Sequence, residues 1–136
     1  MSEPQILHFE RLKAIQRGGG VITKPLAGEW IGTEHFTSGI TTFPPGAGMM
    51  LHTHNVEEAV TILEGDAEVE VGGEICRLKR LDTTFAPVGT PHRFTNVGDG
   101  PMSILWVYAT THVTRTIVET GETAEHLSPA DMSVAS

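Results

Sequence analysis

Short stretches of alternating apolar and polar residues run through the chain, and residues 66–71 show the pattern most plainly. Alanine or valine occupies every second position there, with glutamate between them. Because successive side chains of a strand point to opposite faces of a sheet, this pattern is typical of an antiparallel strand with one buried and one solvated face. Gly72 and Gly73 follow directly, and such a pair predicts a two-residue hairpin turn.

Similar stretches rich in β-branched and aromatic residues recur along the chain, separated by glycine and proline turns. Frequent turns and the lack of a long helical pattern predict an all-β fold, either an antiparallel barrel or a double-sheet sandwich. We expect strands within residues 21–26, 33–43, 58–63, 66–71, 74–78, 81–86, 92–97, 102–108 and 111–118.

The chain length fits one domain with three parts. Residues 1–20 are expected to be an N-terminal extension that holds a short helix or an edge strand. Residues 21–120 would form the barrel. Residues 121–136 are polar, and we expect them to be a mobile C-terminal tail.

Composition narrows the range of partners. Nine Lys or Arg residues stand against 17 Asp or Glu residues, which gives a net charge of −8. Nucleic acids and anionic membranes bind clustered basic residues, so we expect neither partner. Cys76 is the only cysteine, which excludes an internal disulfide and a thiolate-rich structural zinc site, and we expect it to be a small core residue. With no signal-peptide pattern at the N-terminus, these features predict a cytoplasmic protein.

Four potential metal ligands occur at two places in the chain. His52 and His54 are two residues apart, so in a strand they project to the same face. Residues 55–57 can turn the chain so that Glu58 points back at the same spot, and His92 can complete the cluster. Three imidazoles and one carboxylate suit one divalent transition metal, namely Fe, Mn, Ni, Zn, Co or Cu. An octahedral ion would keep two open positions for water, oxygen or a chelating substrate.

The spacing of these residues resembles the two motifs of the cupins. The first motif, G-x5-H-x-H-x3,4-E-x6-G, and the second, G-x5-P-x-G-x2-H-x3-N, are matched at nine of ten fixed positions, with a leucine in place of the second motif's leading glycine. The matching residues are Gly46, His52, His54, Glu58, Gly65, Pro87, Gly89, His92 and Asn96, and the exception is Leu81. The resemblance implies a small jelly-roll β-barrel (a double-stranded β-helix) with the metal inside, commonly assembled as a homodimer.

Several reactions remain open at such a site. We expect a metal-dependent enzyme that acts on a small oxygenated metabolite, either a dioxygenase or a redox-neutral cyclase, isomerase or lyase. The alternative is a non-catalytic module that binds a small ligand or a sugar. No tyrosine or lysine base is evident beside the ligands, because the positions expected to face the metal are Val60 and Ile62. His35 is the one candidate acid or base outside the ligand set.

The remaining histidines and aromatic residues give weaker indications. His8, His112 and His126 have no partners at motif spacing, so we expect them at the surface. Trp106 and Tyr108 share one face of a strand. Parity alone does not say whether that face lines the barrel or covers a sheet or dimer interface.

Overall fold

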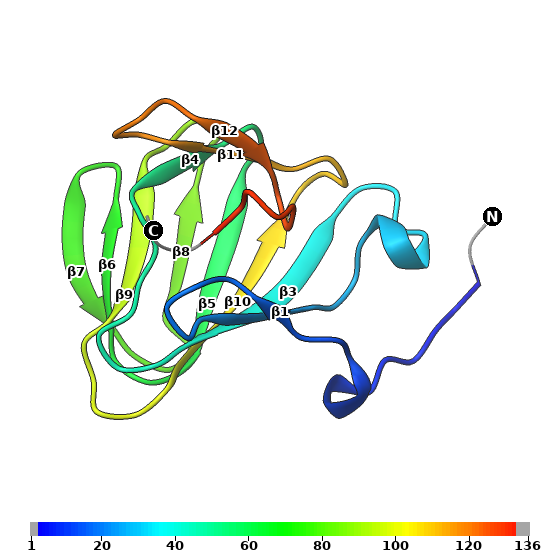
Figure 1. The fold of residues 1–136 in the computed structure, drawn as a ribbon, viewed down its shortest axis with the longest axis horizontal. Coiled ribbons are helices and arrows are strands. Elements are labelled where there is room, and N and C mark those ends of the chain that lie inside the picture. The colour runs from blue at the N-terminus through cyan, green and yellow to red at the C-terminus, as the bar shows by residue number, and fades with distance from the viewer. Residues whose placement is uncertain (1–2, 133–136) are drawn as a thin grey trace.

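The computed structural model describes residues 3–132, and these residues form a jelly-roll of two facing antiparallel sheets, as Figure 1 shows. The all-β prediction is therefore confirmed. The first sheet contains, in spatial order, β1 (Ile15–Gln16), β2 (Ile22–Pro25), β3 (Thr37–Phe43), β10 (Met102–Tyr108), β5 (Glu58–Glu64) and β8 (Thr83–Ala86). The second contains β12 (Thr123–Glu125), β11 (Thr114–Ile117), β4 (His52–His54), β9 (His92–Asn96), β6 (Ala67–Val71) and β7 (Glu74–Leu78).

The core lies between the two sheets and follows the alternation of residues along most of the inner strands. In β3 every second residue is buried, from Thr37 to Phe43, as expected for a strand that turns one face inward. Val60, Ile62 and Phe94 are all buried in this core, as their parity with the metal ligands predicted.

Two turns contain residues with a positive φ, one at glycines and one at a leucine. Gly72 and Gly73 have φ values of 59° and 86°, the double positive φ that a two-residue hairpin between β6 and β7 requires. Leu81, which replaces a motif glycine, also has a positive φ of 74°. A bulky residue rarely adopts this conformation. The backbone therefore has the shape expected for the motif glycine, although a leucine occupies the position.

The two ends of the described chain differ in how they meet the sheets: residues 3–11 are exposed and project from the barrel, whereas the C-terminal segment packs on it (Figure 1). The N-terminal extension contains a 3-10 helix, η1 (Phe9–Arg11), and β1, which pairs with β2 at the edge of the first sheet. At the other end β12 pairs with β11, and Asp131 is fully buried. Residues 123–132 thus differ from the expected mobile tail, because backbone pairing and a buried carboxylate hold them on the barrel. Residues 133–136 of that expected tail lie outside the described residues.

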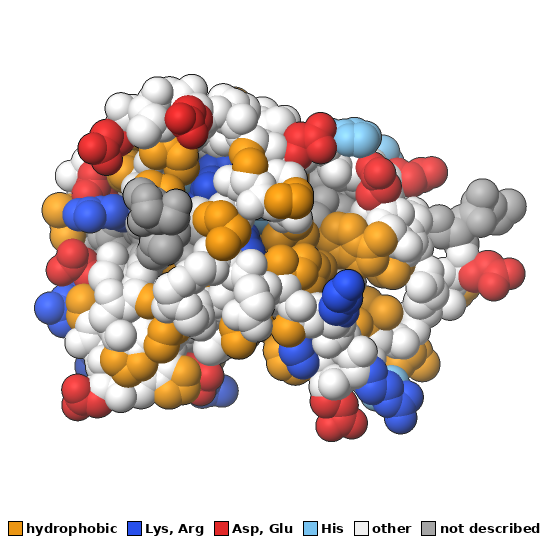
Figure 2. All heavy atoms as spheres, in the orientation of Figure 1, with side chains coloured by type: hydrophobic (Ala, Val, Ile, Leu, Met, Phe, Trp, Pro, Cys, Tyr) orange, Lys and Arg blue, Asp and Glu red, His pale blue; other side chains and the backbone are white. Residues whose placement is uncertain are grey.

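The surface is uneven in character. Figure 2 shows acidic side chains spread along the outline and hydrophobic side chains gathered between the C-terminal segment and the second 3-10 helix, η2 (Glu29–Ile31). Cys76 is exposed on β7, so its expected place in the core is wrong: β7 is an edge strand with an exposed outer face. Among the described residues, no helix has the length and apolar character needed to cross a membrane.

Candidate metal centre

The four sequence-predicted ligands meet inside the barrel. His52 and His54 are the two buried residues of β4, and His92 is the cross-strand partner of His52 on β9. The ligand atoms of these three histidines all lie within 4.8 Å of one another. Glu58, the first residue of β5, reaches in from the opposite sheet, and its Oε1 lies 2.9 Å from His92 Nε2.

Backbone carbonyls fix the orientation of all three imidazoles. His52 Nδ1 donates to the carbonyl of Met50 at 2.6 Å, and His54 Nδ1 donates to that of Thr114 at 2.9 Å. The corresponding bond from His92 Nδ1, to the carbonyl of Thr90, is 2.7 Å long. Because a carbonyl can only accept, the proton of each neutral ring must be on Nδ1. Each Nε2 is then a free lone pair, the form that binds a metal.

The contact between Glu58 and His92 tests whether the site fits a metal. Glu58 Oε1 and His92 Nε2 are both buried, and neither has a hydrogen bond of acceptable geometry. Two buried lone pairs facing each other at 2.9 Å need a cation between them, either a proton or a metal ion. Two ligands that bind one ion at right angles, each about 2.1 Å from it, lie about 3 Å apart. The donor set therefore fits a divalent transition metal.

The electrostatics of the site favour neutral imidazoles on β4. Burial, together with the neighbouring histidines, holds the pKa of His52 well below its usual value. Burial likewise lowers the pKa of His54, although the charge of Glu58 partly opposes this. Burial acts in the same direction on His92, but its 2.9 Å contact with Glu58 and that residue's charge outweigh burial and raise the pKa of His92. Without a metal, a proton is held most readily between His92 and Glu58.

A tyrosine that the sequence reasoning missed stands beside the ligands. Tyr108 is the last residue of β10 and is in register with Glu58 on β5. Its hydroxyl lies 3.2 Å from His54 Nε2, to which it can donate. Burial, followed by the charge of Glu58, raises the pKa of Tyr108 well above its usual value, so the phenol stays protonated. The expectation of no tyrosine beside the ligands is wrong, because strand pairing, not motif spacing, brings Tyr108 to the site.

An aromatic wall closes one side of the cavity. The ring of His126 lies 4.8 Å from that of Trp106 and 4.9 Å from that of Tyr108, measured between centroids. Burial and nearby arginines hold the pKa of His126 well below its usual value. His126 was expected at the surface, but it is half-buried, because pairing of β12 with β11 carries it over the mouth of the barrel. Gly39 makes room for the wall, since a Cβ there would lie 2.2 Å from the Trp106 indole.

Behind the wall, two arginines share one buried aspartate. Arg17 Nη2 donates to Asp131 Oδ2 at 2.9 Å, and Arg115 Nε lies 2.8 Å from Asp131 Oδ1. Arg115 also lines the metal cavity, and its buried Nη1 has no hydrogen-bond partner among residues 3–132. With Glu58 counted, two carboxylates balance the two guanidinium groups, so a bound divalent cation would leave the cavity positively charged and would favour an anionic ligand.

The structure does not bring His35 into this site. Its side chain is 89% exposed and lies 3.8 Å from the carboxylate of Glu34. A candidate acid or base must be within hydrogen-bond reach of the reacting group, and His35 does not line the metal cavity.

The cavity bounded by the ligands, the aromatic wall and Arg115 is small. Its volume is about 20 Å³, room for about one water-sized sphere. The arrangement can thus hold an ion and a very small group, but a larger molecule needs space outside these walls.

Comparison with known proteins agrees with the fold and the ligand pattern. Residues 39–108, about half of the chain, match the family model described as the cupin domain. The chain belongs to the cupin family. This cupin is 29% identical over 97 residues to the polyketide synthase CurC of Streptomyces cyaneus, a match that covers 71% of this chain and 63% of that relative. The cupin thus spans less than two thirds of the relative's length.

Solved structures share the same jelly-roll. The polyketide cyclase RemF of Streptomyces resistomycificus superposes with a TM-score of 0.69 at 19% identity, over 79% of this cupin and 80% of that chain. An oxalate decarboxylase of Lactobacillus farciminis, solved as a formate complex, gives 0.73 at 20% identity, over 82% of this cupin and 35% of that chain. At these identities the likeness shows the fold alone.

Proposed function

We propose that this cupin is a metal-dependent, redox-neutral enzyme of the cyclase or isomerase class that acts on an enolisable carbonyl compound. The observation that carries the proposal is the protonated Tyr108 hydroxyl, 3.2 Å from the ligating nitrogen of His54. A proton donor at this distance from a metal ligand suits acid–base chemistry at the metal, for which no oxidant is needed.

Each part of the site has a role in such a reaction. A divalent ion held by His52, His54, Glu58 and His92 would polarise a carbonyl oxygen. Tyr108 donates a hydrogen bond to an oxygen that gains negative charge as the enolate forms, and a donor fixed in a buried site needs little reorganisation. The α-proton that leaves the substrate carbon would pass to a water molecule, because Glu58 and the three clustered histidines would hold the metal and Tyr108 keeps its own proton. The remaining residues bind and shield.

Arg115 supplies the second contact to a negatively charged oxygen. Its Nη1 is buried, has no hydrogen-bond partner in the part of the chain that the structure describes, and belongs to a residue that lines the cavity. An unpaired guanidinium nitrogen is costly to bury, and an enolate or carboxylate oxygen of a substrate would satisfy it. Trp106 and His126 exclude bulk water, which strengthens both contacts.

The relative CurC supports a redox-neutral reaction over an oxygenation. CurC is named a polyketide synthase protein, and ring closure of a polyketide proceeds through enolates of adjacent carbonyl groups. We extend only this class of chemistry, enolisation of a carbonyl compound that can chelate a metal, to the present chain.

Proton exchange tests the proposal. Protein loaded in turn with Zn(II), Ni(II), Mn(II) or Fe(II) is mixed with acetylacetone in D2O, and exchange of the α-protons is followed by NMR alongside an oxygen electrode. We expect metal-dependent exchange without oxygen uptake, and a rate at least about 10-fold lower in Tyr108→Phe at equal metal content. Iron-dependent oxygen consumption would favour a dioxygenase instead, and binding of the probe without exchange would favour a ligand-binding module.

A further inference from the structure

A second, much larger pocket lies on the outside of the barrel mouth, next to the metal cavity. Its volume is about 760 Å³, within the range of pockets that hold small organic molecules. We call it the outer groove. Its apolar lining comes from the N-terminal extension, η2 and the C-terminal strands: Leu12, Ile15, Pro25, Trp30, Val113 and Leu127.

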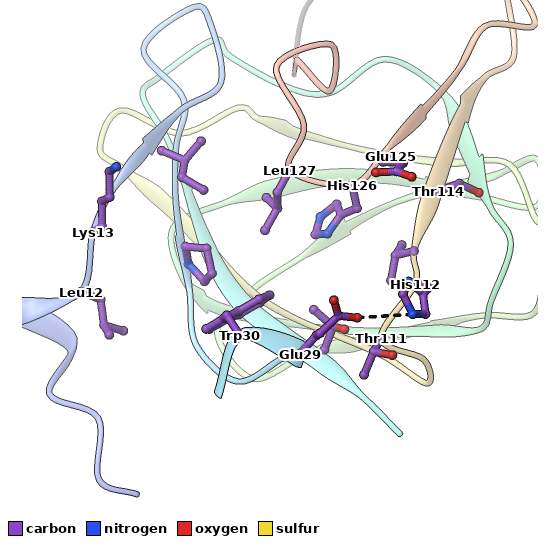
Figure 3. Close-up of a pocket in the computed structure, with 14 residues that line it drawn as sticks. Leu12, Lys13, Glu29, Trp30, Thr111, His112, Thr114, Glu125, His126 and Leu127 are labelled. Atoms are coloured by element: carbon purple, nitrogen blue, oxygen red, sulfur yellow. Dashed lines mark ion pairs between the residues drawn. The ribbon is translucent and has the colours of Figure 1, made fainter. Parts of the chain in front are cut away.

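Figure 3 shows how the groove is walled. His126 and Leu127 extend from the C-terminal segment on one side, Trp30 lies across from them, and Leu12 and Lys13 stand at the far end. The rim is polar, with His112 Nε2 3.3 Å from a carboxylate oxygen of Glu29. The groove thus joins an apolar floor to a charged edge.

His126 is the one described residue that lines both the outer groove and the metal cavity. Its ring packs on Trp106 and Tyr108 on the cavity side. The backbone N–H of His126 donates to the carbonyl of Val113 at 2.9 Å, which anchors the main chain at the border of the two spaces. The imidazole is therefore a partition one ring thick between the two spaces.

We propose that the outer groove binds the body of the substrate whose reacting end binds at the metal. His126 is the positioning residue between the two spaces, and the reacting end passes beside it to enter the cavity. This inference rests on the proposed function and names its substrate class: a flat, largely apolar, unsaturated molecule with two chelating oxygens at one end. The metal cavity, at about 20 Å³, has no room for such a body.

Trp30 is the main indication of a flat ligand. Its side chain is 51% exposed although its Nε1 donates to the carbonyl of Leu26 at 3.4 Å, which fixes the ring. Gly28 lets the indole lie directly on the backbone, since a Cβ there would be 2.3 Å from the ring. A large aromatic face held in place yet left partly in water is a platform on which an unsaturated ring can stack.

The continuity of the groove with the metal cavity is the reason to assign it to the substrate and not to another protein. A protein surface docked there would cover the groove but would gain nothing from the partition at His126. A small molecule with a chelating end uses both spaces at once, because contacts in the groove place its oxygens at the metal.

Affinity of an inert probe tests the groove separately from turnover. Zinc-loaded protein is titrated with salicylate and with 1-hydroxy-2-naphthoate, which share one chelating end but differ by one ring, and tryptophan fluorescence is followed. We expect the naphthoate to bind at least 10-fold more tightly, and this advantage to fall below 3-fold in Trp30→Ala. Equal affinities in the wild-type protein would overturn the assignment of the groove. Because neither probe needs to react, this result is independent of the acetylacetone experiment.

The partition is tested by the rate at which pyridine-2,6-dicarboxylate removes zinc. Replacing His126 by Ala joins the two spaces, so we expect removal to be at least 10-fold faster. His126→Phe keeps a ring in place, and His112→Ala removes a histidine from the groove without touching the partition; both should stay within 3-fold of wild type. An unchanged rate in His126→Ala, or an equal increase in His126→Phe, would overturn the role of His126.

Light scattering adds a check on the occupant. If Trp30→Ala dissociates a dimer while the naphthoate advantage persists, the groove is an interface between copies and the proposal is wrong. If the assembly is unchanged and the advantage is lost, the groove binds the substrate body.

Discussion

The ligand cluster and the wall that encloses it are neighbours in space but are encoded in different ways. His52, His54 and Glu58 lie within seven consecutive residues, at spacings that a strand and a tight turn convert directly into a cluster. The aromatic wall and the ion pairs behind it are assembled from residues such as His126 and Arg17, which are far apart in sequence and meet only through strand pairing. Chemistry at the metal depends on the cluster, whereas access and selectivity depend on the wall.

The largest effect is expected from breaking the cluster alone. His92→Ala removes one imidazole and leaves Glu58 without its 2.9 Å neighbour. Mutating a group that only hydrogen-bonds to a metal ligand already costs about 10–100-fold in metal affinity. Loss of a ligand itself should therefore cost at least about 100-fold. The strands stay paired through backbone bonds, so circular dichroism should be unchanged. Isothermal titration with Zn(II) measures the affinity, with His35→Ala as the control, and equal affinities would remove His92 from the site.

Breaking the ion pairs behind the aromatic wall should instead destabilise the fold. Asp131→Ala leaves Arg17 and Arg115, both buried, without their shared carboxylate, and loss of one partner in such a group costs about 3–5 kcal/mol. Urea unfolding of the two proteins measures the difference. The exposed Asp99→Ala serves as the control and should change stability by less than about 0.5 kcal/mol. An Asp131→Ala protein as stable as the control would show that the C-terminal segment is not held by this network.

Acid should lower the unfolding free energy of the metal-free protein, through histidines of both the ligand cluster and the aromatic wall. The pKa values of His52, His54 and His126 are lowered in the folded state. Below the usual pKa of about 6.5 the unfolded chain therefore binds more protons at these residues than the folded protein does. The unfolding free energy consequently decreases as the pH is lowered. His92 opposes this, because its pKa is raised and its contribution is lost only as pH rises through that value.

Three lowered groups against one raised group give a net fall in stability between about pH 7 and 5, with each group worth up to about 1.4 kcal/mol per pH unit. Urea titrations of metal-free protein at several pH values measure the slope. His126→Phe removes one of the three lowered groups and should flatten it. A slope that is zero or of opposite sign in the wild-type protein would contradict this account.

The two regions also differ in how far the sequence could predict them. Alternation and turn residues were enough for the all-β fold, and ligand spacing was enough to bring His52, His54, Glu58 and His92 together, because both depend on local geometry. Tyr108 was missed because its place beside Glu58 depends on the register between β10 and β5. His126 was missed because pairing of a three-residue strand, β12, leaves almost no pattern in the sequence.

The smallest effect concerns the motif position that departs from the family pattern and belongs to neither region. Leu81 holds a positive φ of 74° while its N–H donates to the carbonyl of Ile62 at 2.7 Å. Leu81→Gly should relieve about 1–2 kcal/mol of strain and lose about 0.5–1 kcal/mol through the entropy of the unfolded chain. We therefore expect a net gain in unfolding free energy of about 0–1.5 kcal/mol, with metal affinity unchanged. Leu81→Ala shares the strain and should gain nothing, so equal stabilities of the two variants would show that this backbone conformation carries no penalty here.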